Sequence, residues 1–437
     1  MTTTQYNEAG EKELNNNDFY EEVINDPSKN VKTQSDILVQ SMMQKSEISE
    51  KVCTFLENGG CRLSNYYHLL KTHNIPHDLD NPCDWLEENG FPIRGIISGR
   101  GSPLERLSGF VDHFLQPGMK KLPTFLQDTK HTLQILDEVN QKIDSGEFSL
   151  EGVGVVSLDV DKMYNNMTED LGVGACTEFL NGRVASVGGG SQEDLQVTTN
   201  SILQALDLCM KNNFFEFNGR IFKQTKGVGT GLKMAPPYAC LGLGKFENLV
   251  FDSNEECLEL IKLWKRYIDD ILMLFKGSRQ QLDELVEWLN SLMPGVIRFK
   301  SNFSNKKIEF LDLIILIEDG KIETDLYIKP TNLQLYLDYF SNHPQHCKVG
   351  IVYSQAIRII ERCSKIEYTE SHLEKLKNKL IERNYPLEVI EEQFERAQKK
   401  ERKKLIYQKR KSQTKDDKVR LICCHIIYLG TCKKFRG

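Results

Sequence analysis

Apolar residues recur every three or four positions in several stretches of this chain, a spacing typical of helices that bury one face. One such stretch covers residues 104–143, where Pro117 and Pro123 predict a helix, a break and a second helix. The other predicted helices cover residues 193–211, residues 280–292, the region around Ile357, residues 372–383 and a stretch from Leu387 into a basic run. Residues 1–60 are polar and helix-prone, and residues 65–101 favour loops and short strands.

Shorter apolar runs with β-branched residues predict strands between these helices. A Val-rich run from Val153 to Leu158 ends at Asp159, where a loop begins. Two hairpins are indicated by turn dipeptides, Asn218-Gly219 within "FFEFNGRIFKQ" and Asp319-Gly320 within "IEDGKIE". A Gly-rich segment after residue 224 runs into an apolar helix near Pro237. The mixture of strands and helices predicts an α+β fold.

The stretch "LWKRYIDDILMLFKG" predicts strand, tight turn and strand, with Asp269 and Asp270 at the turn. Two aspartates in a hairpin are most often turn chemistry, because Asp tolerates tight backbone geometry. Here, however, apolar residues flank the pair on both sides, and two unpaired carboxylates are costly to bury unless a cation neutralises them. A third carboxylate, Asp159, would complete the oxygen ligands for two Mg²⁺ ions, which stabilise the attacking and leaving oxygens in phosphoryl transfer.

Composition changes this picture little. The chain has 437 residues, of which 40% are hydrophobic and 27% charged, as in an ordinary globular protein with an ample core. The formal net charge of -6 gives no overall sign of nucleic-acid binding, so any basic surface must be local. The best candidate is "RAQKKERKKLIYQKRK", residues 396–411, for which a solvated helix face or a nuclear-import tract is an equally good interpretation.

The twelve cysteines lack CxxC spacing, and the N-terminus has no secretion-signal pattern, so we expect an intracellular, reducing environment and a nuclear location. Cys423, Cys424, His425 and Cys432 lack paired ligand spacing and are interpreted as ordinary thiols and a histidine rather than as a zinc site. No apolar run approaches the roughly 20 residues that span a bilayer, so we expect no membrane partner.

Five segments together resemble the ordered motifs of reverse transcriptases, specifically those of Penelope-like retroelements, whose reverse transcriptase domain is related to that of telomerase. In chain order they are "SLDVDKMYNNM", "TGLKMAPPYACLGLGKFE", "RYIDDILMLF", "KIEFLDLIIL" and "LYIKPTNLQLYLDYFSNHPQHCKVGIVYSQAIRI". The likeness extends from about Gln5 to about Arg420. It implies a right-hand polymerase, with fingers, a palm built on an antiparallel sheet, and a helical thumb.

The resemblance also implies roles for single residues. Asp159 and Asp269 match the essential metal ligands, with Asp270 as an auxiliary carboxylate, for two Mg²⁺ ions with Mn²⁺ as an alternative. Tyr164 matches the ring that excludes a ribose 2'-hydroxyl, although a core aromatic is the plainer interpretation. The other residues that match nucleotide-binding positions are Lys71 in "YHLLKTHN", Arg94 in "PIRGIISG", and Gly231, Lys233 and Pro236 in "GLKMAP". The residues that match primer-binding positions are Tyr327, Lys329 and Pro330, all within "LYIKPT".

The chain also departs from the family pattern. It lacks the upstream Lys-Gly-Gly segment, and it has Thr230-Gly231 where Met-Gly is common and Asp161-Lys162-Met163 where a Lys-Ser-Leu-like stretch is common. Family members continue into a GIY-YIG endonuclease, of which "HIIYLGTCKKFRG" resembles only the beginning, so we assign no nuclease domain. None of these departures removes a metal ligand.

We therefore expect three regions: an N-terminal helical segment (residues 1–60), fingers and palm (61–325), and primer grip with thumb (326–437). The expected function is an RNA-directed DNA polymerase of a retrotransposon, with an RNA template, a DNA primer and deoxynucleoside triphosphates as partners. Two alternatives stay open, a catalytically inactive nucleic-acid-binding remnant of a mobile element and a metal nuclease built on the same carboxylates. The nuclease gives no reason for Arg94, Tyr164 and the Gly-rich segment to occur together.

Overall fold

The computed structural model describes all residues except 73–74, 77–81, 182–184, 188–194, 254 and 409–437. Its helices are α1 Thr3–Leu14, α2 Ser28–Gln44, α3 Glu50–Glu57, α4 Pro82–Asn89, α5 Glu105–Met119, α6 Thr129–Asp144, α7 Met163–Asn166, α8 Glu169–Leu180, α9 Thr199–Lys211, α10 Ala235–Phe251, α11 Arg279–Leu292, α12 Gln345–Arg362, α13 Ile366–Ile381, α14 Leu387–Gln398 and α15 Arg402–Tyr407. A 3₁₀ turn, η2, covers Glu256–Leu260. Within these ranges no helix is both long and apolar enough to span a bilayer.

The strands form several small sheets rather than one large one. They are β1 Tyr20–Val23, β2 Ser64–Leu70, β3 Ile93–Ser98, β4 Val153–Val160, β5 Ala185–Val187, β6 Leu195–Val197, β7 Phe214–Phe217, β8 Arg220–Gln224, β9 Ile261–Tyr267, β10 Asp270–Lys276, β11 Phe299–Ser304, β12 Lys307–Phe310, β13 Leu313–Glu318 and β14 Lys321–Leu326. Both turns indicated by dipeptides are confirmed, because Asn218-Gly219 and Asp319-Gly320 adopt the positive φ values that such hairpins require.

The central sheet is antiparallel, with strand order β11-β4-β10-β9, and both of its faces are covered. On one face, Met273 and Phe275 of β10 pack with α10 and α11. On the other, Leu272 and Leu274 pack with α6 and with the second sheet, β12-β13-β14. The uninterrupted apolar run after Asp270 is explained by this double burial, since alternate side chains of a strand point to opposite faces.

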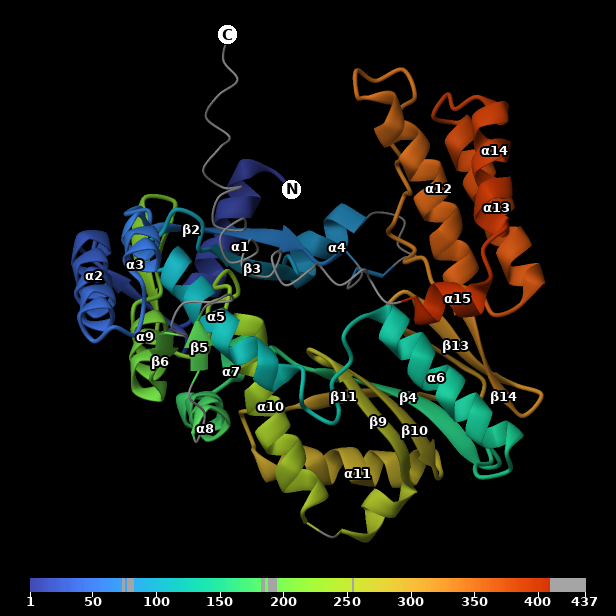
Figure 1. Cartoon of the computed structure of the whole chain (residues 1–437), viewed down its shortest axis with the longest axis horizontal. Helices are drawn as coiled ribbons and strands as arrows, with labels where there is room; N and C mark the ends of the chain where they lie inside the picture. The colour runs from blue at the N-terminus through green and yellow to red at the C-terminus, as the bar shows by residue number, and fades with distance from the viewer. Residues whose placement is uncertain (73–74, 77–81, 182–184, 188–194, 254, 409–437) are drawn as a thin grey trace.

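The N-terminal part of the chain forms a separate sheet, with strand order β1-β8-β7-β2-β3. Its core is aromatic: the Tyr66 ring contacts the rings of Phe215 and Phe217, and Tyr20 packs edge-on against Phe215. Strand β1, from the first thirty residues, pairs along its length with β8. This sheet and helices α1 to α5 lie to the left of the central sheet in Figure 1.

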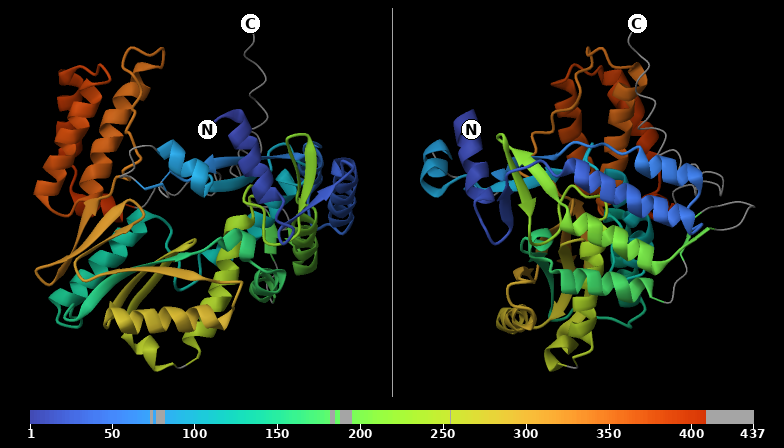
Figure 2. Two further views of the ribbon diagram at one scale, coloured as in Figure 1. Left: turned by 180° about the vertical axis from the view of Figure 1, so that it is seen from behind. Right: turned by 90° about the vertical axis from the view of Figure 1, so that its left-hand side faces the viewer.

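Helices α12, α13 and α14 form an upright bundle on the opposite side of the molecule. They bury a core of their own, to which Leu326 at the end of β14 contributes. The left view of Figure 2 shows from behind that this bundle stands apart from the N-terminal sheet, with the central sheet below both. The arrangement is a U with the central sheet at its base.

Three predicted elements need correction. The helix predicted from Glu193 begins only at Thr199, where the Thr198 side chain accepts a hydrogen bond from Ser201 N, and residues 195–197 form β6. Pro117 does not end α5, which continues to Met119 although the proline lacks the N–H of one helical hydrogen bond. Helix α4 replaces part of the predicted loops.

Candidate active site

Strands β4 and β10 of the central sheet bring the acidic residues together. Asp270, the first residue of β10, is paired in register with Asp159 of β4. Both side chains therefore project from the same face of the sheet, the face on which Leu272 and Leu274 are covered further along the strand. Asp269 lies in the connecting turn, and its carbonyl oxygen accepts a hydrogen bond from the backbone N–H of Val160, 3.2 Å away. The three carboxylates thus come from two neighbouring strand ends.

The turn that carries Asp269 has an unusual backbone. Ile268 adopts φ of 57°, in the left-handed region that β-branched residues strongly avoid. Only Ile268 and Asp269 connect β9 to β10, so the direct strand connection requires this conformation. Backbone strain of this kind costs about 1–3 kcal/mol and persists only where the surrounding structure holds it in place.

A buried ion pair provides that support. Arg266, the residue before Tyr267, is 2% exposed and donates from Nε and Nη2 to the carboxylate of Glu247 on α10 at 2.8 and 2.9 Å. Its Nη1 donates to the carbonyl oxygen of Ile268 at 3.0 Å. The Glu247 carboxylate also accepts hydrogen bonds from Trp264 Nε1 and Thr124 Oγ1. This network fixes the strained residue to the helix below.

The site disfavours three ionised carboxylates in the absence of a cation. Burial raises the pKa of Asp269, its own backbone N–H partly offsets that rise, and the charge of Asp159 adds to it. For Asp270, burial and then the charges of Asp269 and Asp159 raise the pKa to about 6. Carboxylate oxygens that destabilise one another in this way are suited to a divalent cation such as Mg²⁺, which would relieve their repulsion.

Two basic side chains from other parts of the chain act on the same carboxylates. Arg94 of β3, in the N-terminal sheet, lowers the pKa of both Asp269 and Asp270. Lys329, three residues after the end of β14, lowers the pKa of Asp270. Both side chains are exposed. Of the basic residues predicted for the site, these two act on the acidic cluster.

Tyr164 lies at the edge of the same site. It belongs to the short helix α7, is partly buried, and has a pKa raised by burial first and then by the charges of Cys240 and Asp269. Its carbonyl oxygen accepts a hydrogen bond from Val228 N at 2.8 Å. Gly227 is required beside it, because a Cβ there would lie 2.3 Å from that oxygen and because its φ is 78°.

The Gly-rich segment is attached to β3. A Cβ on Gly231 would lie 1.6 Å from the carbonyl oxygen of Ile97, and Thr230 Oγ1 accepts a hydrogen bond from Ile97 N at 3.3 Å. Close packing against β3 therefore requires a glycine at position 231, in addition to its predicted role in nucleotide binding. Lys233 is exposed and lies against Gly109 of α5, and Pro236 lies in the first turn of α10, where proline is tolerated.

The other predicted contact residues lie close in the structure or the sequence to Arg94 or Lys329. Lys71 N donates to the Pro92 carbonyl oxygen and so extends the pairing of β2 with β3, the strand that carries Arg94. A hydrogen bond with Glu309 raises the pKa of Tyr327 to about 12, and Pro330 is exposed. Tyr327 and Pro330 belong to the segment after β14 that carries Lys329. Their predicted ligand contacts stay predictions, and Cys423, Cys424, His425, Cys432 and residues 409–411 lie outside the described ranges.

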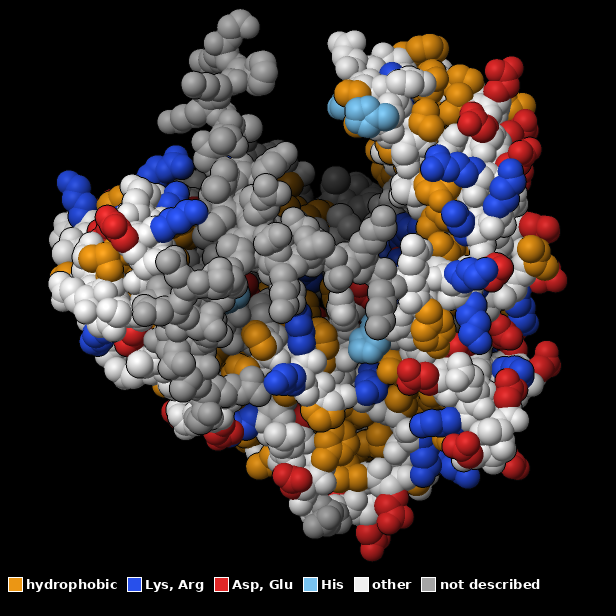
Figure 3. Space-filling view, viewed as in Figure 1, with side chains coloured by type: hydrophobic (Ala, Val, Ile, Leu, Met, Phe, Trp, Pro, Cys, Tyr) orange, Lys and Arg blue, Asp and Glu red, His pale blue; other side chains and the backbone are white. Residues whose placement is uncertain are grey.

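Sequence reasoning missed Arg266 and Glu247. A usable signal existed, because each charge occupies an inward position of an otherwise apolar element: Arg266 follows Trp264 at strand period, and Glu247 lies in the helix "APPYACLGLGKFENLVF". Two opposite charges at core positions predict a buried pair. The hollow that the space-filling view shows between the helical bundle and the rest of the molecule lies above the central sheet (Figure 3).

Comparison with known proteins bears on the fold. Telomerase from Candida albicans, solved with a TWJ fragment of telomeric RNA, is similar over 76% of this chain and 64% of its own, with 10% identity and a TM-score of 0.50. Apo telomerase from Candida tropicalis is similar over 71% and 57%, with 12% identity and a TM-score of 0.47. The BmCPV RNA-dependent RNA polymerase at the elongation state is similar over 84% of this chain and 30% of its own, with 13% identity and a TM-score of 0.44.

The right-hand polymerase fold is confirmed. The likeness to the C. albicans telomerase carries this conclusion, and the mixed helices and antiparallel sheets agree with it. The chain spans 64% or less of the length of these telomerases. Residues 335–395, which include α12, α13 and most of α14, match the family described as an animal helix-turn-helix domain. No curated protein matches the chain in sequence.

Proposed function

We propose that this protein is an RNA-directed DNA polymerase of a retrotransposon, of the Penelope-like type, acting in the nucleus. It extends a DNA primer on an RNA template with deoxynucleoside triphosphates. The observation that carries the proposal is the register of Asp159 opposite Asp270, with Asp269 in the turn between the strands. The charges of Arg94 in β3 and of Lys329, which follows β14, both act on the Asp270 carboxylate.

In this proposal each residue has a task that its position supports. Asp159 and Asp269, with Asp270 beside them, would hold two Mg²⁺ ions, which would supply charge stabilisation for phosphoryl transfer. Arg94 binds the triphosphate, for which a forked guanidinium is suited. Lys329 holds the end of the primer backbone near the carboxylates. The ring of Tyr164 restricts the space at the sugar of the incoming nucleotide.

Arg266 is a positioning residue in this mechanism. Its guanidinium touches neither primer nor nucleotide but holds the carbonyl of Ile268, and thereby the direction in which Asp269 leaves the turn. Catalysis by metals and positioned groups is sensitive to displacements of about 1 Å. The buried pair with Glu247 therefore supports catalysis through geometry rather than through contact with the substrate.

Primer extension tests the proposal directly. The purified chain is incubated with a labelled DNA primer annealed to RNA or DNA templates, Mg²⁺ and deoxynucleotides. We expect elongation on the RNA template. Binding of the primer–template without elongation supports the alternative of an inactive nucleic-acid-binding remnant and overturns the polymerase. Shortening of the labelled strand supports the metal nuclease and overturns it as well.

A further inference from the structure

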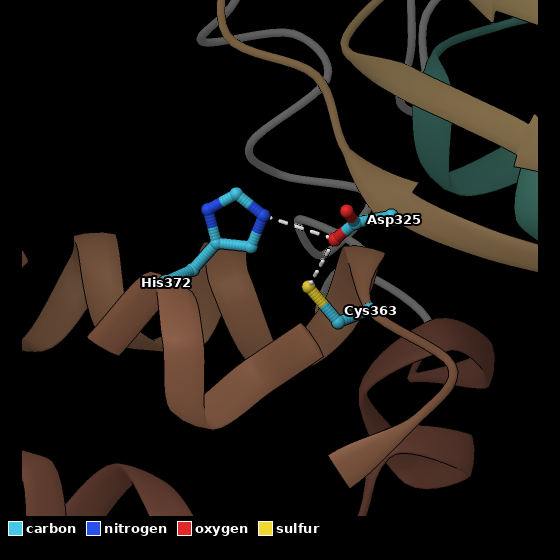
Figure 4. A group of neighbouring side chains, drawn as sticks. All are labelled: Asp325, Cys363 and His372. Carbon is cyan, nitrogen blue, oxygen red and sulfur yellow. Dashed lines mark hydrogen bonds and ion pairs between the residues drawn. The ribbon is translucent and has the colours of Figure 1, made fainter. Parts of the chain in front are cut away.

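A second group of potential metal ligands lies where the helical bundle joins the central part of the chain (Figure 4). Asp325 belongs to β14, Cys363 follows the last residue of α12, and His372 lies in α13. Their donor atoms lie within 4.8 Å of one another, and the side chains of Cys363 and His372 both point to the carboxylate of Asp325. None of the three belongs to the proposed polymerase site.

The distances fit the dimensions of a zinc site. Cys363 Sγ lies 3.3 Å from Asp325 Oδ1, and His372 Nε2 lies 3.0 Å from the same oxygen. In a tetrahedral zinc site with bonds of about 2.0 to 2.3 Å, neighbouring donor atoms lie roughly 3.3 to 3.7 Å apart. A small outward movement of these side chains would therefore seat an ion between them.

As a purely hydrogen-bonded group, the cluster places many donors on one oxygen. Asp325 Oδ1 accepts from His372 Nε2, from the Cys363 thiol and from the Leu326 backbone N–H at 2.7 Å. A carboxylate oxygen has two lone pairs in the carboxylate plane, so three donors crowd it. A metal ion that replaces the two side-chain protons would instead collect one lone pair each from sulfur, nitrogen and oxygen.

The backbone around the cluster holds the ligands in place. Ser364 N donates to the Thr324 carbonyl oxygen at 2.8 Å, and Thr324 N donates to Ser364 Oγ at 2.8 Å. The Thr324 hydroxyl donates to the Arg362 carbonyl oxygen at 2.7 Å. Asp325 and Cys363 are therefore neighbours of a fixed joint between β14 and the end of α12. Preorganised ligands lower the entropic cost of binding an ion.

Burial and accessibility also suit a bound ion. Cys363 is buried, whereas the side chains of His372 and Asp325 are 11% and 20% exposed. An ion can thus enter from solvent, and a water molecule can take the fourth position. The combination of thiolate, imidazole and carboxylate favours Zn²⁺ over Mg²⁺, since Mg²⁺ prefers oxygen ligands alone.

We propose that Asp325, Cys363 and His372 bind one Zn²⁺ ion that fastens the helical bundle to β14. Two residues after Asp325 the chain reaches Tyr327, and Lys329 follows, so the ion would fix the strand that leads to the carboxylate site. The inference is independent of polymerase activity, because it concerns metal binding and stability alone.

Metal content and a cobalt spectrum test the proposal. The full chain is stripped with chelator, equilibrated with Zn²⁺ or Co²⁺ and freed of excess metal. We expect the wild-type chain to hold about one tightly bound Zn²⁺ more than the Cys363→Ser variant. With cobalt, the wild-type chain should show a thiolate-to-cobalt charge-transfer band that the Cys363→Ser variant lacks. His372→Asn should lose the same equivalent, which keeps the test decisive if one variant folds poorly.

Two controls locate the metal. Cys347→Ser removes an exposed thiol whose Sγ lies 3.4 Å from His346 Nε2, in the first turn of α12, and should leave zinc content unchanged. Cys424→Ser probes the cysteines near the C-terminus. Zinc content and a cobalt spectrum that are equal in wild type, Cys363→Ser and His372→Asn would overturn the proposal. So would zinc that is lost only in Cys424→Ser.

Discussion

At the scale of single residues, the central feature is that two aspartates lie side by side in a hairpin with two buried faces. Folding raises the pKa of the Asp270 carboxyl from its usual 3.8 to about 6, first through burial and then through the charges of Asp269 and Asp159. The folded chain without metal therefore binds more protons than the unfolded chain between these pH values. The stabilisation by a protonated Asp270 is complete below about pH 4 and is lost as the pH rises through about 6.

Because an ionised Asp270 destabilises the metal-free folded chain at high pH, we predict that Asp270→Asn stabilises that chain at about pH 8 but not at about pH 4. After a discount for partial solvent screening, the gain at the higher pH is about 1 kcal/mol in the free energy of unfolding. Thermal unfolding in chelator at both pH values checks this, with Asp18→Asn, at an exposed position, as the matched control. An equal change in melting temperature at both pH values contradicts the assignment.

A second residue-scale prediction concerns Tyr164, which lies beside Asp269 and is held by the bond from Val228 N to its carbonyl. Tyr164→Ala should admit ribonucleotides, raising their incorporation relative to deoxynucleotides by about tenfold or more, because one ring contact is worth about 1–3 kcal/mol. Tyr164→Phe keeps the ring and should discriminate like wild type. The measurement is kcat/KM for both nucleotide types. Unchanged discrimination in Tyr164→Ala would rule out this role.

At this scale the sequence predicted a strand that ends near Asp159 and a hairpin that turns at Asp269 and Asp270. The structure adds that β4 and β10 are neighbours, which pairs Asp159 with Asp270 in register. The long-range approach of Arg94 and Lys329 was implied only by the family resemblance. Local periodicity carries no information about which distant strand ends meet, since that depends on sheet order.

At the scale of elements, the β9–β10 hairpin depends on α10. The positive φ of Ile268 needs support, and the Arg266 side chain supplies it through the Ile268 carbonyl while Glu247 neutralises the buried guanidinium. Helix α10 itself follows the Gly-rich segment that packs on β3. The hairpin and the helix are thereby connected through the Arg266–Glu247 ion pair, and the helix and the N-terminal sheet through the close approach of Gly231 to Ile97.

We predict that Arg266→Met lowers the free energy of unfolding by about 3–5 kcal/mol, because it leaves the Glu247 carboxylate buried and unpaired. Arg266→Lys keeps the charge but lacks the fork that reaches both Glu247 and Ile268. It should slow primer extension while primer–template affinity stays the same, which separates positioning from folding. Lys265→Met, on the same strand, is the control for both measurements. Wild-type extension by Arg266→Lys would show that the turn does not need this contact.

Element prediction from the sequence was most successful where a turn dipeptide or an unbroken helical period was present, as at Asn218-Gly219 and residues 280–292. It failed where tertiary contacts decided the boundary. Helix α5 continues through Pro117 because it packs on α9 and α10, and β6 takes up residues that read as the beginning of a helix. A charged residue in a strand is usually taken as outward-facing, which is why Arg266 was overlooked.

At the scale of the whole molecule, the helical bundle is joined to the base of the U by Asp312. Its carboxylate accepts hydrogen bonds from Thr129 of α6 and from Arg358 and Arg362 of α12. Burial alone would raise the pKa of Asp312, but the Thr129 hydroxyl and the charges of the two arginines outweigh it and lower the pKa. The ionised Asp312 carboxylate therefore stabilises the folded chain above the usual pKa of an aspartate. This stabilisation is lost as the pH falls through the lowered pKa.

We predict that Asp312→Asn loosens this joint. It should reduce primer–template affinity and the number of nucleotides added per binding event, with a loss of about 1–3 kcal/mol in unfolding free energy. Addition of the first nucleotide at saturating primer–template should stay near the wild-type rate, because the carboxylate site is untouched. Glu318→Gln alters a partly exposed ion pair with Lys365 at the same junction and serves as the control. Unaltered affinity in Asp312→Asn would contradict the role of this joint.

The overall architecture was predictable from the order of the motifs, and the right-hand polymerase fold is confirmed. The boundaries of the three regions stay predictions. Strand β1, within the predicted N-terminal segment, pairs with β8 from the middle of the chain, and no local signal announces such a pairing. The proposed zinc cluster illustrates the same difficulty, because its three residues are distant in sequence and lack paired spacing.

The most direct test of the central claim, that Asp159 and Asp269 form a shared metal site, is the rate of single-nucleotide addition on a preformed primer–template complex. Asp159→Ala and Asp269→Ala should each lower that rate by at least about a hundredfold, while fluorescence anisotropy shows primer–template binding near wild type. Asp283→Ala should do neither. Addition by either site variant at the wild-type rate would contradict the account.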